Sequence, residues 1–214
     1  MTEIINFILH IDKYLIGIVE QYGFLTYLFL FTIVFAETGL VFFPFLPGDS
    51  LLFAAGAIAA LGSLNIWVLL LVLSTAAVLG DTVNYWIGHF FGEKIVSNPK
   101  FPLIKPEHIV KTNAFYAKHG PKTIVLARFV PIVRTFAPFV AGVGKMHYDT
   151  FLFYNIIGGL SWVFTFTLTG FFFGNLAFVQ KNFELVIVAI ILVSVVPMVI
   201  EWWKAKKEKT ATNT

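Results

Sequence analysis

Long uncharged runs of apolar residues dominate the chain. Residues 50–79 and 150–180 contain no Asp, Glu, Lys or Arg, and shorter uncharged runs cover residues 21–36 and 185–200. A helix rises about 1.5 Å per residue, so about 20 residues cross the apolar part of a bilayer. Each long run therefore holds a complete span and part of another segment. The pattern predicts an all-α polytopic membrane protein.

The composition agrees with this class and excludes others. The chain of 214 residues is 58% hydrophobic and 13% charged, and it contains 25 Phe and five Trp. A soluble domain of this size could not keep so many aromatic side chains out of water. Soluble enzymes, nucleic-acid-binding modules and secreted scaffolds do not fit. The absence of Cys excludes disulfides and thiolate metal sites, and the His residues lack metal-ligand spacing.

The basic residues predict the orientation. Ten of the 15 Lys and Arg residues lie in residues 92–122 and in the tail after residue 200. By the positive-inside rule, both segments are expected in the cytoplasm. Residues 1–22 lack the basic start of a cleavable signal peptide. Residues 4–19 suit an amphipathic helix at the membrane interface, with a first membrane span as the alternative.

The apolar stretch 123–144 is a poor lipid-facing helix, because Arg128, Pro131, Arg134 and Pro138 interrupt it. If the basic loop and the tail lie on the same side, the chain between them crosses the membrane an even number of times. Residues 150–175 and 183–203 supply two crossings. The stretch is therefore predicted to be a re-entrant hairpin that enters and leaves from the cytoplasm.

One membrane domain, residues 1–214, is expected. Its predicted segments are an amphipathic helix (1–22), a re-entrant hairpin (23–62), a span (65–91), a basic cytoplasmic loop (92–122), a second re-entrant hairpin (123–146), two spans (150–175 and 183–203) and a cytoplasmic tail (204–214).

Two short motifs occur twice in the same order. Residues 53–56 (FAAG) resemble 139–142 (FVAG), and residues 88–92 (GHFFG) resemble 170–174 (GFFFG). A proline-broken segment precedes each FxAG motif. Its prolines, where the hairpins are expected to break, are Pro44 and Pro47 in the first copy and Pro131 and Pro138 in the second. Each copy contains one span, so the second copy starts on the opposite side of the membrane from the first. The pattern therefore predicts an inverted repeat.

The alternative to a repeat is chance similarity between Phe-rich and Gly-rich segments. The glycines of the GxxxG motifs are predicted to be close-packing positions.

Five ionisable residues lie inside apolar sequence, where each is costly unless it is paired or hydrated. They are Glu37, Asp49, Asp81, Arg128 and Arg134. The first hairpin carries two carboxylates and the second carries two guanidiniums, so opposed hairpins would bring the charges together. An arginine pair suits phosphate, because each planar fork can donate two parallel hydrogen bonds.

The sequence therefore predicts a central site in which Arg128 and Arg134 bind phosphate. Carboxyls in a low-dielectric cavity can exchange protons as neighbouring charges change, so Glu37 and Asp49 are the predicted proton-coupling pair. A static network of buried ion pairs is the alternative.

Asp81, Asn84 and Tyr85 lie together on the first span. They could line the cavity. Interhelical hydrogen bonding would explain such polar residues equally well.

Four segments carry a family resemblance: residues 35–40 (FAETGL), 44–52 (PFLPGDSLL), 80–85 (GDTVNY) and 128–135 (RFVPIVRT). Together they resemble the signature segments of the bacterial DedA membrane-protein family. Further similarity extends over nearly the whole chain, and the charged positions show no departure.

The resemblance implies an inner-membrane protein with two opposed re-entrant hairpins, related to the eukaryotic VTT-domain lipid scramblases. It further implies recycling of undecaprenyl phosphate, the lipid carrier of cell-wall synthesis, and resistance to alkali and cationic antimicrobials that depends on the proton-motive force. The family's essential acidic pair matches Glu37 and Asp49, and its essential basic pair matches Arg128 and Arg134.

The leading functional hypothesis is proton-coupled flipping of undecaprenyl phosphate from the outer to the inner leaflet. The expected partners are membrane lipids and protons, without nucleic acid, metal or cofactor, and a homo-oligomer is left open. One alternative is proton-coupled transport of a small ion or drug, and another is a non-transport protein that organises the envelope. An enzyme is not expected, since residues 128–134 contain no Ser, His or Cys.

Overall fold

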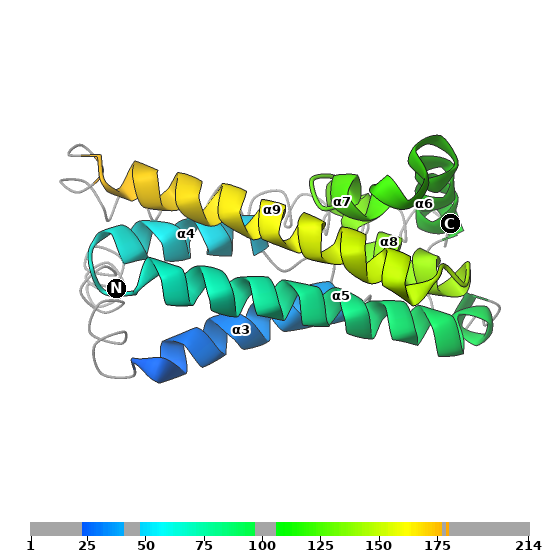
Figure 1. Ribbon diagram of the computed structural model, residues 1–214, viewed down its shortest axis with the longest axis horizontal. Coiled ribbons are helices and arrows are strands. Elements are labelled where there is room, and N and C mark those ends of the chain that lie inside the picture. The colour runs from blue at the N-terminus through cyan, green and yellow to red at the C-terminus, as the bar shows by residue number, and fades with distance from the viewer. Residues whose placement is uncertain (1–22, 41–47, 97–105, 177–178, 180–214) are drawn as a thin grey trace, which may run out of the picture. The chain divides into compact units, whose positions relative to one another are not determined.

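The computed structural model describes residues 23–40, 48–96, 106–176 and 179, and these residues form helices and turns without any strand. The elements, in order, are α3 (Phe24–Gly39), α4 (Gly48–Ala60), α5 (Ile66–Val96), α6 (Pro106–His119), the 3₁₀ turn η1 (Gly120–Lys122), α7 (Thr123–Ala127), α8 (Pro131–Val143) and α9 (Tyr148–Gly174) (Figure 1). The predicted all-α class is confirmed for this part of the chain.

Two of these helices are long and apolar enough to cross a membrane. They cover Ile66–Gly92 and Tyr148–Gly174, with 27 residues each, or about 40 Å of helix against an apolar bilayer thickness of about 30 Å. They coincide with the predicted spans 65–91 and 150–175, although α5 continues to Val96 into the predicted loop. The predicted segments 1–22, 183–203 and 204–214 lie outside the described residues.

Large apolar side chains are exposed along the helices. Trp67 and Phe90 on α5 are 74% and 65% exposed, Phe24 on α3 is 78% exposed, and Phe172 on α9 is 67% exposed. Exposed aromatic residues in such numbers would associate in water, whereas lipid tails solvate them. The surface therefore fits a membrane protein.

Glycine and proline set the helix ends near the second predicted hairpin. Helix α6 ends at His119, and Gly120 follows it with a φ of +58°, the left-handed conformation common after a helix end. Helix α8 begins at Pro131, and Val130 before it is extended, with φ −119° and ψ 105°. A proline disfavours helical backbone in the preceding residue and is well accommodated at the first helical position. The chain therefore breaks between α7 and α8.

The helices belong to two compact units. Helix α4 and the end of α9, from Phe166 onward, belong to the first unit. The second unit contains α3, α5 from Trp67 onward, α6 to α8, and α9 up to Thr165. In Figure 1, α3 lies alongside α5, and Gly39 and Gly80 bring these two backbones close together.

Glycines provide the close helix packing in the first unit. A Cβ atom at Gly56 of α4 would overlap the carbonyl oxygen of Thr167 on α9, and one at Gly170 would overlap the carbonyl oxygen of Phe53. A Cβ atom at Gly174 would lie 2.9 Å from the Cα atom of Ala57. The FAAG motif of the first half of the chain therefore packs on the GxxxG motif of the second half.

The second unit repeats this packing with the roles of the two halves exchanged. A Cβ atom at Gly142 of α8 would overlap the carbonyl oxygen of Tyr85 on α5, and one at Gly88 would overlap the carbonyl oxygen of Phe139. Gly92 similarly faces the side chain of Val143. The prediction that the glycines of the GxxxG motifs are close-packing positions is confirmed.

Candidate functional site

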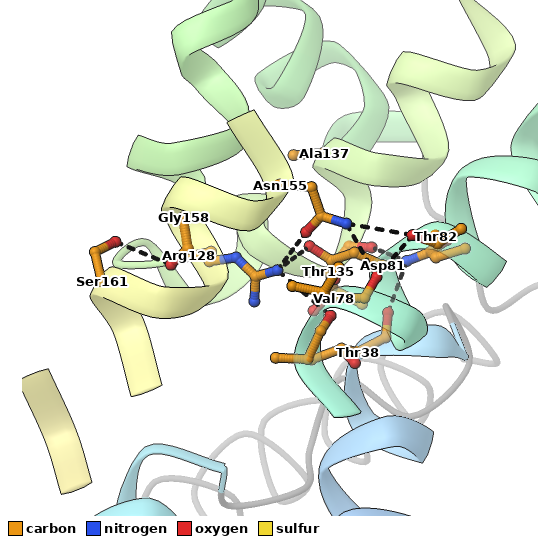
Figure 2. A network of polar contacts seen from close by, with 12 residues as sticks. Thr38, Val78, Asp81, Thr82, Arg128, Thr135, Ala137, Asn155, Gly158 and Ser161 are labelled. Carbon is orange, nitrogen blue, oxygen red and sulfur yellow. Dashed lines mark hydrogen bonds and ion pairs between the residues drawn. The ribbon is translucent and has the colours of Figure 1, made fainter. Parts of the chain in front are cut away.

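Arg128 is buried and held by several acceptors. Its Nη2 atom lies 2.6 Å from Oδ2 of Asp81 on α5, and the two side chains are only 5% and 6% exposed. The same nitrogen donates to Oδ1 of Asn155 on α9 at 2.7 Å. Asn155 is fixed in turn, because its Nδ2 atom donates to the carbonyl oxygen of Val78 at 3.0 Å (Figure 2). The charge of Arg128 is thus neutralised and its position fixed from two helices.

Adjacent glycines on α9 make room for this guanidinium. A Cβ atom at Gly158 would lie 3.2 Å from Nε of Arg128, and one at Gly159 would lie 3.5 Å from its Nη2. The contact from Gly158 is tight, whereas that from Gly159 is an ordinary van der Waals contact. The packing of Arg128 therefore depends on a small residue at Gly158.

The second arginine forms an ion pair with the first predicted hairpin. Nη2 of Arg134, on α8, lies 2.5 Å from Oε1 of Glu37, on α3. The side chain of Glu37 is 5% exposed and that of Arg134 is 17% exposed. The sequence places these two residues on opposite predicted hairpins, and the fold brings them into direct contact.

Both ion pairs line one pocket of the second unit. It contains about 300 Å³ of empty space, its open mouth included. Its lining residues come from α3, α5, the residue after α7, α8 and α9, and they are Glu37, Thr38, Asp81, Arg128, Arg134, Thr135 and Trp162. Two guanidiniums and two carboxylates thus meet beside one aromatic ring, which suits an oxyanion better than an apolar ligand.

Trp162 contacts both cations. The guanidinium carbons of Arg128 and Arg134 lie over its ring, at 5.8 Å and 5.6 Å from the ring centroid. These distances are in the range of cation–π attraction. The side chain of Trp162 is buried, so water screens this attraction little.

Asn84 does not line the pocket but connects two of its walls. Its Nδ2 atom donates to the carbonyl oxygen of Thr38, at the end of α3, at 3.1 Å. It also donates to the carbonyl oxygen of Thr135, on α8, at 3.0 Å. Of the two interpretations left open by the sequence, the contacts correspond to interhelical hydrogen bonding.

The other predicted site residues have varied locations. Asp81 lines the pocket. The hydroxyl of Tyr85 donates to the carbonyl oxygen of Met146, and its ring lies 4.4 Å from that of Phe151 in an aromatic cluster. Asp49 lies in the first turn of α4, in the first unit, whereas the pocket belongs to the second unit.

Of the predicted hairpin breaks, Pro131 begins α8 and Pro138 lies inside it. Pro44 and Pro47 are outside the described residues. No group of three or more His, Asp or Glu residues that could hold a metal ion occurs in the described ranges.

Three pocket residues were not predicted from the sequence, namely Thr38, Thr135 and Trp162, and neither was Asn155, which holds Arg128. Asn155 is an amide within a run without charges, which is a signal for a buried hydrogen bond. Trp162 offers no such signal, because a tryptophan in an aromatic-rich span is ordinary. Its role depends on which side chains of α8 and α9 face each other.

The fold and the pocket define a helical membrane protein with ion-paired charges buried among its helices. A family model described as VTT domain matches residues 46–172. The chain is 55% identical to the protein DedA of Escherichia coli (strain K12), over 95% of this chain and 94% of DedA. It is 32% identical to the inner membrane protein YqjA of the same strain, over 81% of this chain and 79% of YqjA.

An uncharacterized membrane protein of Mycobacterium tuberculosis is 44% identical over 78% of this chain and 74% of that protein. No solved structure shows significant similarity. The chain belongs to the DedA family of VTT-domain membrane proteins.

Proposed function

We propose that this protein moves an anionic lipid phosphate across the bacterial inner membrane by a proton-coupled mechanism, with undecaprenyl phosphate as the candidate lipid. The observation that carries the proposal is the meeting of Arg128 and Arg134 in one pocket, where each pairs with a carboxylate. Arginine forks match the geometry of phosphate oxygens and keep their charge when they are removed from water. The carboxylates occupy these forks until a phosphate replaces them.

Exchange of a carboxylate for a phosphate provides the coupling to protons. When phosphate binds Arg134, Glu37 loses its ion pair with this arginine, and its buried charge becomes more costly. Protonation of Glu37 removes that cost. Each bound headgroup is thus accompanied by a proton, and release of the proton restores the ion pair. Asp49, carried by the first predicted hairpin, is the second candidate proton carrier.

The proposed topology is an inverted repeat of a re-entrant hairpin and a span. The reciprocal glycine packing supports it, because the FxAG motif of each half packs on the GxxxG motif of the other. Such repeats in transporters place broken helices around a site near the membrane midplane. With residues 92–122 and the tail in the cytoplasm, exposed aromatic side chains would face lipid and leave the polyprenyl tail outside the pocket.

Reconstitution tests this function directly. Purified protein in liposomes that contain labelled undecaprenyl phosphate is assayed for transfer of the lipid between leaflets, with and without a pH gradient. Wild-type protein is expected to accelerate transfer and to respond to the gradient. Arg134→Ala is expected to lose the acceleration, whereas Lys111→Ala, a change of an exposed charge on α6, should retain it.

Other outcomes would favour the alternatives. Equal transfer by wild-type protein and Arg134→Ala, without a pH effect, would refute the proposal. Gradient-driven uptake of a small solute without lipid transfer would indicate a small-ion or drug transporter. Folded Arg134→Glu and Glu37→Arg variants that still restore envelope function in cells would indicate a non-transport role.

A further inference from the structure

We propose that Trp162 is a positioning residue of this pocket, whose ring holds Arg128 and Arg134 together so that they can receive an anionic phosphate headgroup. The inference rests on the proposed function, because it concerns the same phosphate-binding site. It assigns a role to a residue that carries neither a charge nor a recognisable sequence motif.

Geometry is the first argument. Arg128 follows α7 and Arg134 lies on α8, yet both guanidinium carbons lie within 6 Å of the centroid of the same ring on α9. Trp162 is 2% exposed and lines the pocket. One side chain therefore links the two cations across the site.

Electrostatics is the second argument. Two guanidiniums in one low-dielectric pocket repel each other, and the carboxylates offset this repulsion only while the ion pairs remain closed. The electron-rich face of an indole attracts cations. The indole ring is not a strong hydrogen-bond acceptor, so the N–H groups of the two guanidiniums remain available to donate to Asp81, to Glu37 or to an incoming phosphate. The attraction therefore persists while Arg134 exchanges its partner.

Preorganisation links this geometry to affinity. If the ring is removed, the guanidiniums must be ordered when the headgroup binds, and that cost reduces the affinity. From the usual strength of a desolvated cation–π contact, we expect the apparent affinity for the headgroup to fall by about 5- to 30-fold. The maximal transfer rate should fall less, because the groups that exchange the proton are retained.

A series of fluorinated tryptophans at position 162 separates this role from simple packing. Each fluorine withdraws electron density from the ring face while the shape of the side chain changes little. The concentration dependence of transfer is measured in liposomes of phosphatidylcholine with increasing undecaprenyl phosphate. We expect a graded loss of apparent affinity with the number of fluorines. Trp162→Phe should be intermediate and Trp162→Leu weakest.

Trp67 provides the matched control. It is 74% exposed on α5, so the same fluorinated residues at position 67 should leave the affinity unchanged. If the series at position 162 is also flat, Trp162 serves only in packing and the inference is refuted, even if Trp162→Leu fails to fold.

Binding is measured independently of transport by the fluorescence of Trp162, in protein whose other four tryptophans are replaced by Phe. The probes are phosphatidylcholine vesicles with or without undecaprenyl phosphate, and inorganic phosphate alone. A saturable spectral change with the lipid, lost in Arg134→Ala, is expected. A spectral change with inorganic phosphate but none with the lipid would support the role of Trp162 and contradict the lipid substrate. Lipid transfer without any spectral change would refute the inference and leave the proposed function standing.

Discussion

Asn84 provides the sharpest test of how the pocket is held together. Its two hydrogen bonds reach the carbonyl oxygens of Thr38 and Thr135. These residues directly follow Glu37 and Arg134, the two members of one ion pair. Replacing Asn84 by Leu removes both donors and keeps a side chain of similar volume. The substitution should therefore separate the contribution of the hydrogen bonds from that of packing.

The expected loss of stability follows from the contacts. A neutral hydrogen bond contributes about 0.5–1.5 kcal/mol in proteins and about 0.6 kcal/mol on average in a membrane protein. Two such bonds give about 1–3 kcal/mol, and the unpaired carbonyl oxygens add to the loss. The buried Oδ1 atom of Asn84 has no hydrogen-bond partner in the described part of the chain. Removing this unpaired atom offsets part of the loss of stability. We expect a net loss of about 2 kcal/mol.

Thermal unfolding in detergent measures this loss. For a chain of this length, about 2 kcal/mol corresponds to a decrease in Tm of about 4–8 °C. Asn175→Leu is the matched control, because the Nδ2 atom of Asn175 is exposed and donates to the carbonyl oxygen of Phe171, in the last turn of the adjoining α9, at 2.9 Å. An unchanged Tm for Asn84→Leu, or an equal decrease for both variants, would refute the proposed clamp.

Two further predictions concern packing and pH. Gly142→Ala and Gly56→Ala should each destabilise the protein by about 1–3 kcal/mol or more, because the added Cβ atom would overlap a neighbouring backbone. Gly144→Ala is the control and should melt near the wild-type temperature, since its Cβ atom would lie 3.2 Å from its nearest neighbour. Equal melting temperatures for all three variants would contradict the packing. Burial raises the pKa of Tyr116 on α6 above its ordinary value of 10, and its hydroxyl donates to the carbonyl oxygen of Ala137 at 2.9 Å. Because folding favours the protonated phenol, its contribution to stability is present below about pH 10 and is lost as the pH rises further. Between about pH 7 and 11, the melting temperature of Tyr116→Phe should therefore decrease less than that of the wild type. Parallel decreases in melting temperature would contradict this assignment.

Charge and proline patterns predict much of the fold, because lipid permits few alternatives. An uncharged run long enough to span the bilayer forms a helix, since its backbone groups need internal partners. The predicted spans therefore match α5 and α9 closely. Pro131 likewise marks the start of α8, because the steric effects of proline are local. Features set by tertiary packing are less accessible to such patterns.

The pairing of the charges shows where sequence reasoning reaches its limit. The sequence predicts that carboxylates of the first hairpin meet arginines of the second, and Glu37 does pair with Arg134. It does not predict that the partner of Arg128 is Asp81. That choice depends on the rotation of α5 about its axis, and hence on the close approach of Gly80 and Gly88 to their neighbours. Local patterns do not determine such a rotation.

Charge balance explains why proton coupling in the proposed mechanism depends on the pocket rather than on the lipid tail. The described lining residues carry two cations and two carboxylates, so the ion-paired pocket is neutral and can lie in a low-dielectric environment. A singly charged phosphate would give it a net charge of minus one, and burial of an uncompensated charge is very costly. One proton restores neutrality, and a doubly charged phosphate requires two. In the proposed mechanism, a headgroup of this class therefore enters with protons.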